Sequence, residues 1–300
     1  MKHIFLILVI IMIYSCNEND KDKSKMLGDD YRLYKGTSFW ELAKATKADD
    51  FEKMEELVKE QKLDINKREA KFGQTLLFIS ILNGQVDACA KLLSLGADPN
   101  LHETYKDRTP LILAANLPND EISLELIKFL LKYGANINEI QTNLSRRIEY
   151  PDSKPLNSTA LITACSDIRA TSNPLPKVKF LVEAGANINY IGNGNISPLT
   201  ECLSAKKYDI ALYLLEKGAN YKQLFWEHNK YEENKPTYIL DYLRQQVFNF
   251  DSKEYKYKMK VVDFLKTKGL DYWQHPVHPE MVKEIKRLHP ENWEEYLEKY

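Results

Sequence analysis

The stretch TPLILAANLPNDEISLELIKFLLKYGANIN, residues 109–138, predicts two helices joined by a turn. Thr109 and Pro110 are typical of a helix start, because threonine caps free amides and proline has a fixed φ and no donor to lose. The first helix has an apolar face made of Leu111, Leu113, Ala114 and Ala115. In the second, apolar residues recur at three- and four-residue spacing: Ile122, Leu126, Ile127, Leu130 and Leu131. Gly134 follows where a helix needs a left-handed residue.

Both ends of this stretch recur along the chain. The helix-start phrase returns as TLLFISI from Thr75, TALITAC from Thr159, SPLTECL from Ser197 and TYILDYL from Thr237. The closing phrase returns in step as GADPN from Gly96, GANIN from Gly134 and Gly185, GANYK from Gly218 and GLDYW from Gly269. Starts and closings are 21 residues apart in two repeats and further apart in the others, which indicates insertions between the paired helices. A divergent first unit occupies residues 39–66.

The phrases and their 21-residue spacing resemble those of ankyrin repeats. The resemblance implies an all-α ankyrin-repeat solenoid of about six helix-turn-helix repeats with finger loops, over residues 38–273. The family's usual histidine, fourth in the helix-start phrase, is replaced here by Phe78, Ile112, Ile162, Thr200 and Leu240. Because that histidine hydrogen-bonds between neighbouring repeats in related proteins, we expect this stack to depend more on apolar contacts.

Residues 274–300 predict a helical C-terminal cap with helices at Pro279–Leu288 and Pro290–Lys299. Their apolar residues would cover the open face of the last repeat. His275, His278 and His289 occur in the same region, but no cysteine is near and no helix is expected to hold the first two. We therefore expect solvated or packed histidines and no metal site.

The N-terminus predicts a lipoprotein signal peptide over residues 1–15. Lys2 and His3 precede an apolar run from Ile4 to Ile13, which is too short for a bilayer span of about 20 residues. The run ends in IYSC and resembles a bacterial lipobox, although Tyr14 stands where a small residue is usual. The resemblance implies that Cys16 receives diacylglycerol and anchors the protein to a membrane. The alternative is an ordinary cleaved signal with a coincidental cysteine.

The sequence predicts that residues 16–37 comprise the lipidated cysteine and a flexible tether. The segment after Cys16 begins NENDKDKSK and is rich in charge, so it cannot bury enough surface to order itself. Its acid-rich start also resembles the leaders that export some Gram-negative lipoproteins to the cell surface. We expect a protein of the bacterial cell envelope, periplasmic or surface-exposed.

Three cysteines, Cys89, Cys165 and Cys202, occupy apolar helix positions, which favours buried free thiols. A bridge between Cys165 and Cys202 is the alternative. Long loops at 139–158 and 166–177 interrupt the repeats, and prolines at 174 and 176 are expected to forbid a helix across the second. Loops of this size are either functional or simply tolerated.

The sequence carries no Walker phosphate loop, GxGxxG, HExxH, GxSxG or paired CxxC. A net charge of −1 gives no basic excess for nucleic acid. We therefore expect no enzyme, cofactor, metal or small-molecule substrate. The resemblance implies a non-catalytic adaptor or scaffold that binds a protein partner through its concave face and finger loops. The alternative is an immunity protein that occludes a toxin's active site, whose deletion would make cells sensitive to sibling cells.

In ankyrin proteins the contacts come from finger residues before the helix start and from the ends of first helices. The residues at such positions that we expect to bind a partner are Phe72, Tyr105, Lys106, Arg108, Leu117, Leu156 and Ile196. Asn83 and Arg244 also lie at first-helix ends. Exposed apolar groups favour a covering partner. The alternative is that some of these side chains pack against adjacent fingers. Unchanged affinity after Phe72→Ala with Tyr105→Ala would move the site to the convex face or to the long loop with Arg146, Arg147 and Tyr150.

Lipidation can be tested by substituting Cys16→Ala. We expect the variant to leave the membrane fraction and to lose radiolabelled palmitate, because the acyl chains supply the anchoring energy. Palmitate incorporation equal to that of the unsubstituted protein would show that Cys16 is not the lipid site.

Overall fold

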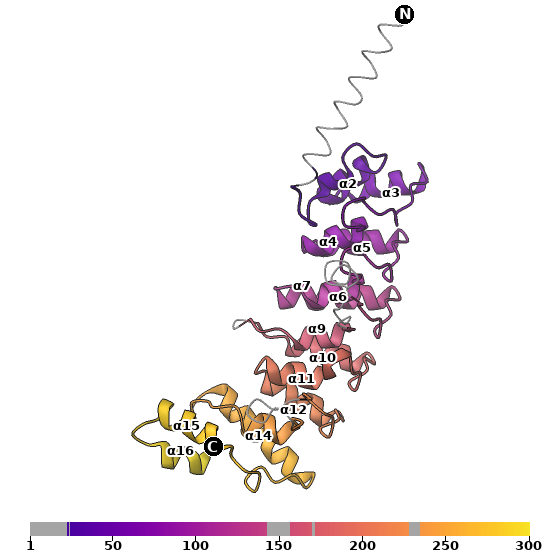
Figure 1. Ribbon diagram of the computed structural model, residues 1–300. Coiled ribbons are helices and arrows are strands. Elements are labelled where there is room, and N and C mark those ends of the chain that lie inside the picture. Colours follow the sequence, from indigo (N-terminus) through magenta and orange to yellow (C-terminus); the bar gives the residue numbers. More distant parts are fainter. Residues whose placement is uncertain (1–22, 24, 143–156, 170–171, 228–234) are drawn as a thin grey trace, which may run out of the picture. The chain divides into compact units, whose positions relative to one another are not determined.

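The structure, a computed structural model, describes residues 23, 25–142, 157–169, 172–227 and 235–300 (Figure 1). The chain divides into two compact units, residues 1–155 and 156–300. Cys16 and Leu156 lie outside the described residues, as do most of loop 139–158 and Arg146, Arg147 and Tyr150. Within the described part, no helix combines the length and hydropathy needed to cross a membrane.

Unit 1 is a stack of helical pairs (Figure 1). Its helices are α2 (Trp40–Lys47), α3 (Phe51–Lys59), α4 (Leu76–Leu82), α5 (Val86–Ser94), α6 (Pro110–Ala115) and α7 (Asp120–Lys132), after the 3-10 helix η1 (Tyr31–Tyr34). The first helices contact one another in order, α2 with α4 and α4 with α6, and α5 packs on α7. Leu113 and Leu130 are buried, as expected of residues that face the stack.

The helix ends follow from the repeated phrases. The Thr109 hydroxyl accepts a hydrogen bond from the Ile112 amide at 3.2 Å, and Pro110 stands in the first turn of α6. After α7 the chain turns at Gly134, whose φ of +89° lies in the left-handed region that glycine enters without strain. The stretch from Thr109 to Asn138 therefore forms the predicted pair of helices joined by a turn.

Unit 2 repeats the pattern with α9 (Ala160–Cys165), α10 (Leu175–Glu183), η2 (Asn193–Asn195), α11 (Pro198–Ser204), α12 (Tyr208–Glu216), α13 (Ile239–Leu243) and α14 (Lys253–Thr267). The prediction that prolines forbid a helix throughout 166–177 is wrong at its end. Helix α10 begins at Leu175, so Pro176 stands in the first turn, where a proline loses no intrahelical hydrogen bond. Cys89 in unit 1, and Cys165 and Cys202 in unit 2, are buried and free.

The last two helices of unit 2 are α15 (Pro279–Leu288) and α16 (Trp293–Lys299). Helix α16 starts three residues later than expected. Met281, Ile285, Tyr296 and Tyr300 form a buried cluster, and Val247 and Phe250 from the segment between α13 and α14 pack against it. Leu288, one of the apolar residues of the predicted cap helices, is exposed, so the expectation that these residues cover the last repeat is wrong for it.

The tether predicted over residues 16–37 is wrong for its second half. Met26, Tyr31, Leu33 and Tyr34 are buried against unit 1. The Tyr31 hydroxyl donates to Gln85 Oε1 at 2.6 Å and lies 2.9 Å from the Ser80 hydroxyl. The composition argument covered the charged start of the segment only, because residues 26–34 carry enough apolar surface to pack.

Neighbouring repeats are joined by a polar contact that sequence reasoning missed. The Asn100 side chain donates from Nδ2 to the Gly134 carbonyl at 3.0 Å and accepts at Oδ1 from the Asn136 amide at 2.7 Å. Asn66 reaches the Gly96 carbonyl and the Asp98 amide in the same way, and in unit 2 Asn189 reaches the Gly218 carbonyl and the Asn220 amide. We call this contact the amide clamp. The amide clamp is a polar link between repeats in a chain that lacks the family histidine, although it lies at another position of the repeat.

Replacing Leu130 with alanine should lower the free energy of unfolding by roughly 2 to 5 kcal/mol, because the side chain is fully buried in unit 1. Leu124→Ala on the same helix is the matched control. Its side chain is partly exposed, so its cost should stay below about 1 kcal/mol. Denaturant unfolding measures both variants, and equal losses would show that the inward face of α7 is misassigned.

Candidate protein-binding surface

Two neighbouring loops of unit 1 form the candidate surface. Finger 1 comprises residues 67–74, between Asn66 and the start of α4, and finger 2 comprises residues 101–108, between Asn100 and the start of α6. Each finger begins directly after an amide clamp, so its base is fixed to the next repeat. The fingers have the same length, and each has a glutamate in its third position, Glu69 and Glu103.

The Glu69 carboxylate organises finger 1 from inside. It is buried and accepts hydrogen bonds from the backbone amides of Phe72 at 2.8 Å, Gln74 at 2.9 Å and Lys71 at 2.6 Å. Several amides converging on one carboxylate compensate its loss of water and leave the loop little freedom. Glu69 therefore acts as a structural core for a loop that has no apolar core of its own.

Tyr34 closes the base of finger 1 from the N-terminal segment. Its hydroxyl lies 2.6 Å from the Lys67 carbonyl and 3.1 Å from the Gln74 carbonyl. Burial raises the pKa of the Tyr34 phenol, with nearby Glu69 adding to the shift, so the group stays a neutral donor. The segment preceding α2 thus helps to hold the finger in place.

The Glu103 carboxylate joins the two fingers. It is fully buried, accepts a hydrogen bond from Arg108 Nε within finger 2 and accepts one at 2.9 Å from Gln74 Nε2 of finger 1. The Phe72 carbonyl accepts from the amides of Thr104 and Tyr105, both at 3.1 Å. These contacts place both fingers on one rigid frame.

Gly73 is required for this close approach. Its φ of +67° is left-handed, and a Cβ at this position would lie 2.1 Å from the Thr104 hydroxyl. Any side chain there would force the fingers apart. The Phe72 and Tyr105 rings consequently meet edge to face, with their centroids 5.6 Å apart.

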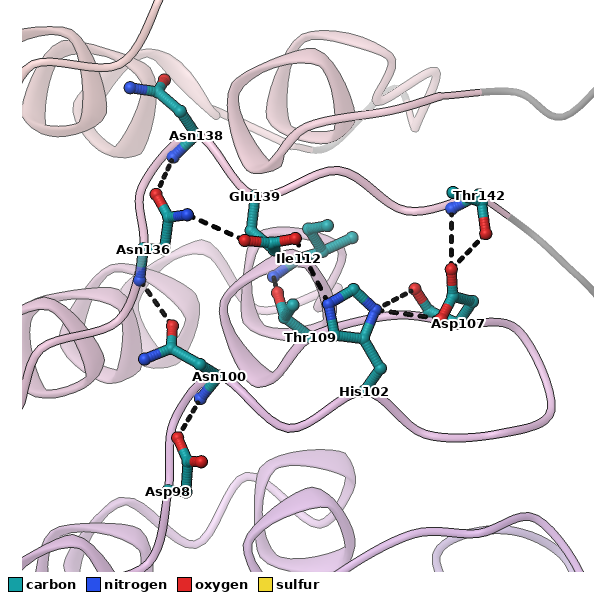
Figure 2. A network of polar contacts seen from close by, with 10 residues as sticks. All are labelled: Asp98, Asn100, His102, Asp107, Thr109, Ile112, Asn136, Asn138, Glu139 and Thr142. Carbon is teal, nitrogen blue, oxygen red and sulfur yellow. Dashed lines mark hydrogen bonds and ion pairs between the residues drawn. The ribbon is translucent and has the colours of Figure 1, made fainter.

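A polar network connects finger 2 to the segment after α7 (Figure 2). His102 Nδ1 lies 3.0 Å from both the carbonyl and the carboxylate of Asp107, and its Nε2 lies 3.5 Å from Glu139. Asp107 also accepts from the amide and hydroxyl of Thr142. Glu139 in turn accepts from the Asn136 side chain at 2.8 Å. The far side of finger 2 is therefore braced as well.

Of the predicted contact residues, the structure brings together Phe72, Tyr105 and Lys106. Tyr105 is 43% exposed, Phe72 is half-buried, and Lys106 is exposed with its ammonium 5.7 Å from the Tyr105 ring centroid. The alternative, that finger side chains pack against an adjacent finger, is confirmed for the rings of Phe72 and Tyr105. They remain partly open to solvent and are stiffened by the contact.

Other predicted contact residues are placed differently. Leu117 is 8% exposed, so its assignment to an exposed face is wrong; burying the apolar side chain in the turn after α6 is favourable. Arg108 is held in the ion pair with Glu103 and has a mostly buried side chain. Ile196, in unit 2, is half-buried beside η2. Leu156 lies outside the described residues.

Two residues at first-helix ends are also engaged. The Asn83 side chain donates to the Asp29 carbonyl at 2.7 Å, so the N-terminal segment already covers this position. Arg244 is buried and donates to the carbonyls of Tyr272 and Tyr300. Both findings favour the fingertips of unit 1 over these helix ends as the open surface.

Residues 42–141 match the family model for ankyrin repeats, in three copies. The match begins within α2, includes both fingers and ends after α7. A search of curated proteins gives no significant match. The predicted all-α ankyrin-repeat fold is confirmed, and proteins of this kind are generally binding modules without catalytic activity.

The frame of the fingers can be tested by substituting Glu103→Ala. The variant leaves Arg108 and Gln74 without their shared partner, and we expect unfolding to become easier by about 2 kcal/mol. Glu125→Ala, an exposed glutamate on α7, should change stability by less than about 0.5 kcal/mol. Chemical denaturation compares the two, and an effect no larger than that of the control would mean that the buried carboxylate does not brace the fingers.

Proposed function

We propose that this ankyrin-repeat protein is a membrane-anchored adaptor or scaffold that binds a protein partner with fingers 1 and 2 of unit 1. The observation that carries the proposal is the partly exposed Phe72–Tyr105 pair on a rigid frame. Aromatic side chains supply much of the energy of protein interfaces. A frame that is already ordered also lowers the entropy cost of binding.

The rigidity of the frame supports a role in recognition. Buried Glu69 and Glu103 fix the backbone of both fingers, and the hydrogen bonds described for their carboxylates come from groups within the fingers. A loop that served only to connect α3 with α4 would need no such arrangement. Three features thus support one surface: exposed aromatic groups, fixed geometry and a base clamped to the next repeat.

The anchor enters the proposal through the N-terminal segment. Lys71 Nζ of finger 1 donates to the Met26 carbonyl at 2.8 Å and to the Lys23 carbonyl at 3.2 Å. If Cys16 carries the lipid, the chain between Cys16 and Lys23 can span at most about 25 Å. The partner would then be bound close to the membrane surface.

Photo-crosslinking in intact cells tests the surface. A photoreactive amino acid in place of Tyr105 should give a light-dependent adduct with another protein, and the same group in place of Tyr133 should not. Tyr133 is the matched control because it is 38% exposed and follows the last residue of α7, outside both fingers. Once the partner is purified, Phe72→Ala with Tyr105→Ala should weaken binding by at least about tenfold with little change in Tm.

Equal adducts at both positions, or none at Tyr105, would contradict the proposal. Unchanged affinity in the double variant would contradict it as well. If Phe72→Ala removes the adduct formed at position 105 and the variant keeps its Tm, the partner contacts the aromatic pair itself.

A further inference from the structure

In the two fingers the acidic side chains are buried or paired and the basic side chains are mostly exposed. Glu69 and Glu103 point inward and are buried, and Asp107 is engaged by His102 and Thr142. The basic side chains of the fingertips are on the outside, where Lys67, Arg68, Lys71 and Lys106 are exposed. The outer surface at residues 67–72 and 104–106 is consequently cationic, although the chain as a whole has a net charge of −1.

Two of these lysines flank the aromatic pair. Lys71 Nζ lies 4.8 Å from the Phe72 ring centroid, and Lys106 Nζ lies 5.7 Å from the Tyr105 ring centroid. A cation over a ring is attracted to it, which keeps the ammonium groups beside the apolar surface. Lys71 Nζ also donates to the Met26 and Lys23 carbonyls, which are neutral, so its positive charge remains beside the Phe72 ring. The fingertips thus present an apolar pair with a positive charge beside each ring.

Resting on the proposed function, we propose that the partner segment bound by the fingertips is an acidic peptide segment that carries an apolar side chain. The apolar side chain lies against the Phe72–Tyr105 pair, and carboxylates on either side face Lys71 and Lys106. Charge complementarity of this kind increases the association rate and excludes basic partners. The affinity should therefore fall as salt is added.

The geometry favours a peptide over a lipid surface. Phe72 is half-buried and Tyr105 is held against it edge to face, so part of the apolar surface of both rings is already covered and cannot insert among acyl chains. A segment laid across the pair can instead contact both the ring surfaces and the flanking ammonium groups. An anionic membrane is the competing occupant and forms one outcome of the test.

The probes are two fluorescent peptides, one with glutamates flanking a single phenylalanine and one with glutamines in their place. With the full chain in neutral detergent, anisotropy should show the glutamate peptide binding at least about tenfold more tightly. The preference should shrink as salt rises from about 50 to 500 mM. Lys71→Glu with Lys106→Glu should abolish it.

Lys132→Glu is the matched control, because Lys132 lies 5.9 Å from the Tyr133 ring and forms the same kind of pair on α7. This control should bind the glutamate peptide as the unsubstituted protein does. Equal binding of the two peptides, no binding of either, or equal losses in the fingertip and control variants would overturn the inference.

Vesicles of neutral lipid with and without phosphatidylglycerol decide between the two occupants. If the fingertip variant loses binding to anionic vesicles and neither peptide binds, the surface meets a membrane and the inference is wrong. The proposed function has a separate readout. A Tyr105 adduct with a partner whose contact segment is not acidic would retain that function and reject only the acidic chemistry.

Discussion

A carboxylate buried in a surface loop must be compensated by nearby donors, and this requirement shapes the fingers of unit 1. Glu69 draws several backbone amides of finger 1 around itself, and Glu103 draws a side chain from each finger. The donors cannot turn to water without leaving a charge unpaired. The two fingers therefore keep one conformation instead of sampling many. The positions of the Phe72 and Tyr105 rings are fixed as a result.

The helical part of the fold could be predicted from the sequence because it depends on local rules. Thr109, Pro110 and Gly134 mark helix ends through their own backbone and side-chain chemistry, and the spacing of leucines marks the buried face. Two predictions are wrong, the absence of helix up to residue 177 and the tether up to residue 37, because in each the rule holds for only part of the segment. Pro176 is compatible with the first turn of α10, and the charge-rich start of the tether concealed the apolar residues that follow it.

The candidate site was only partly predictable. Phe72 and Tyr105 could be placed at the fingertips from the repeat register, but their mutual contact depends on Gly73 and on the distance between two loops. Leu117 and Arg108 were misjudged because register gives a position on a loop and not the direction of its side chain. The glutamate in the third position of both fingers was the available signal for the hidden carboxylates.

The amide clamp has a consequence for how such a chain can change length. Asn66 and Asn100 each hold a glycine carbonyl and a backbone amide of the following repeat, so the bond depends on the spacing of the closing phrase and not on neighbouring side chains. Residues 67–100 could be excised as a block and Asn66 would meet Gly134 in place of Gly96. At this joint the amide clamp would therefore form again, whereas side-chain contacts such as that of Gln74 with Glu103 would be lost with the excised block.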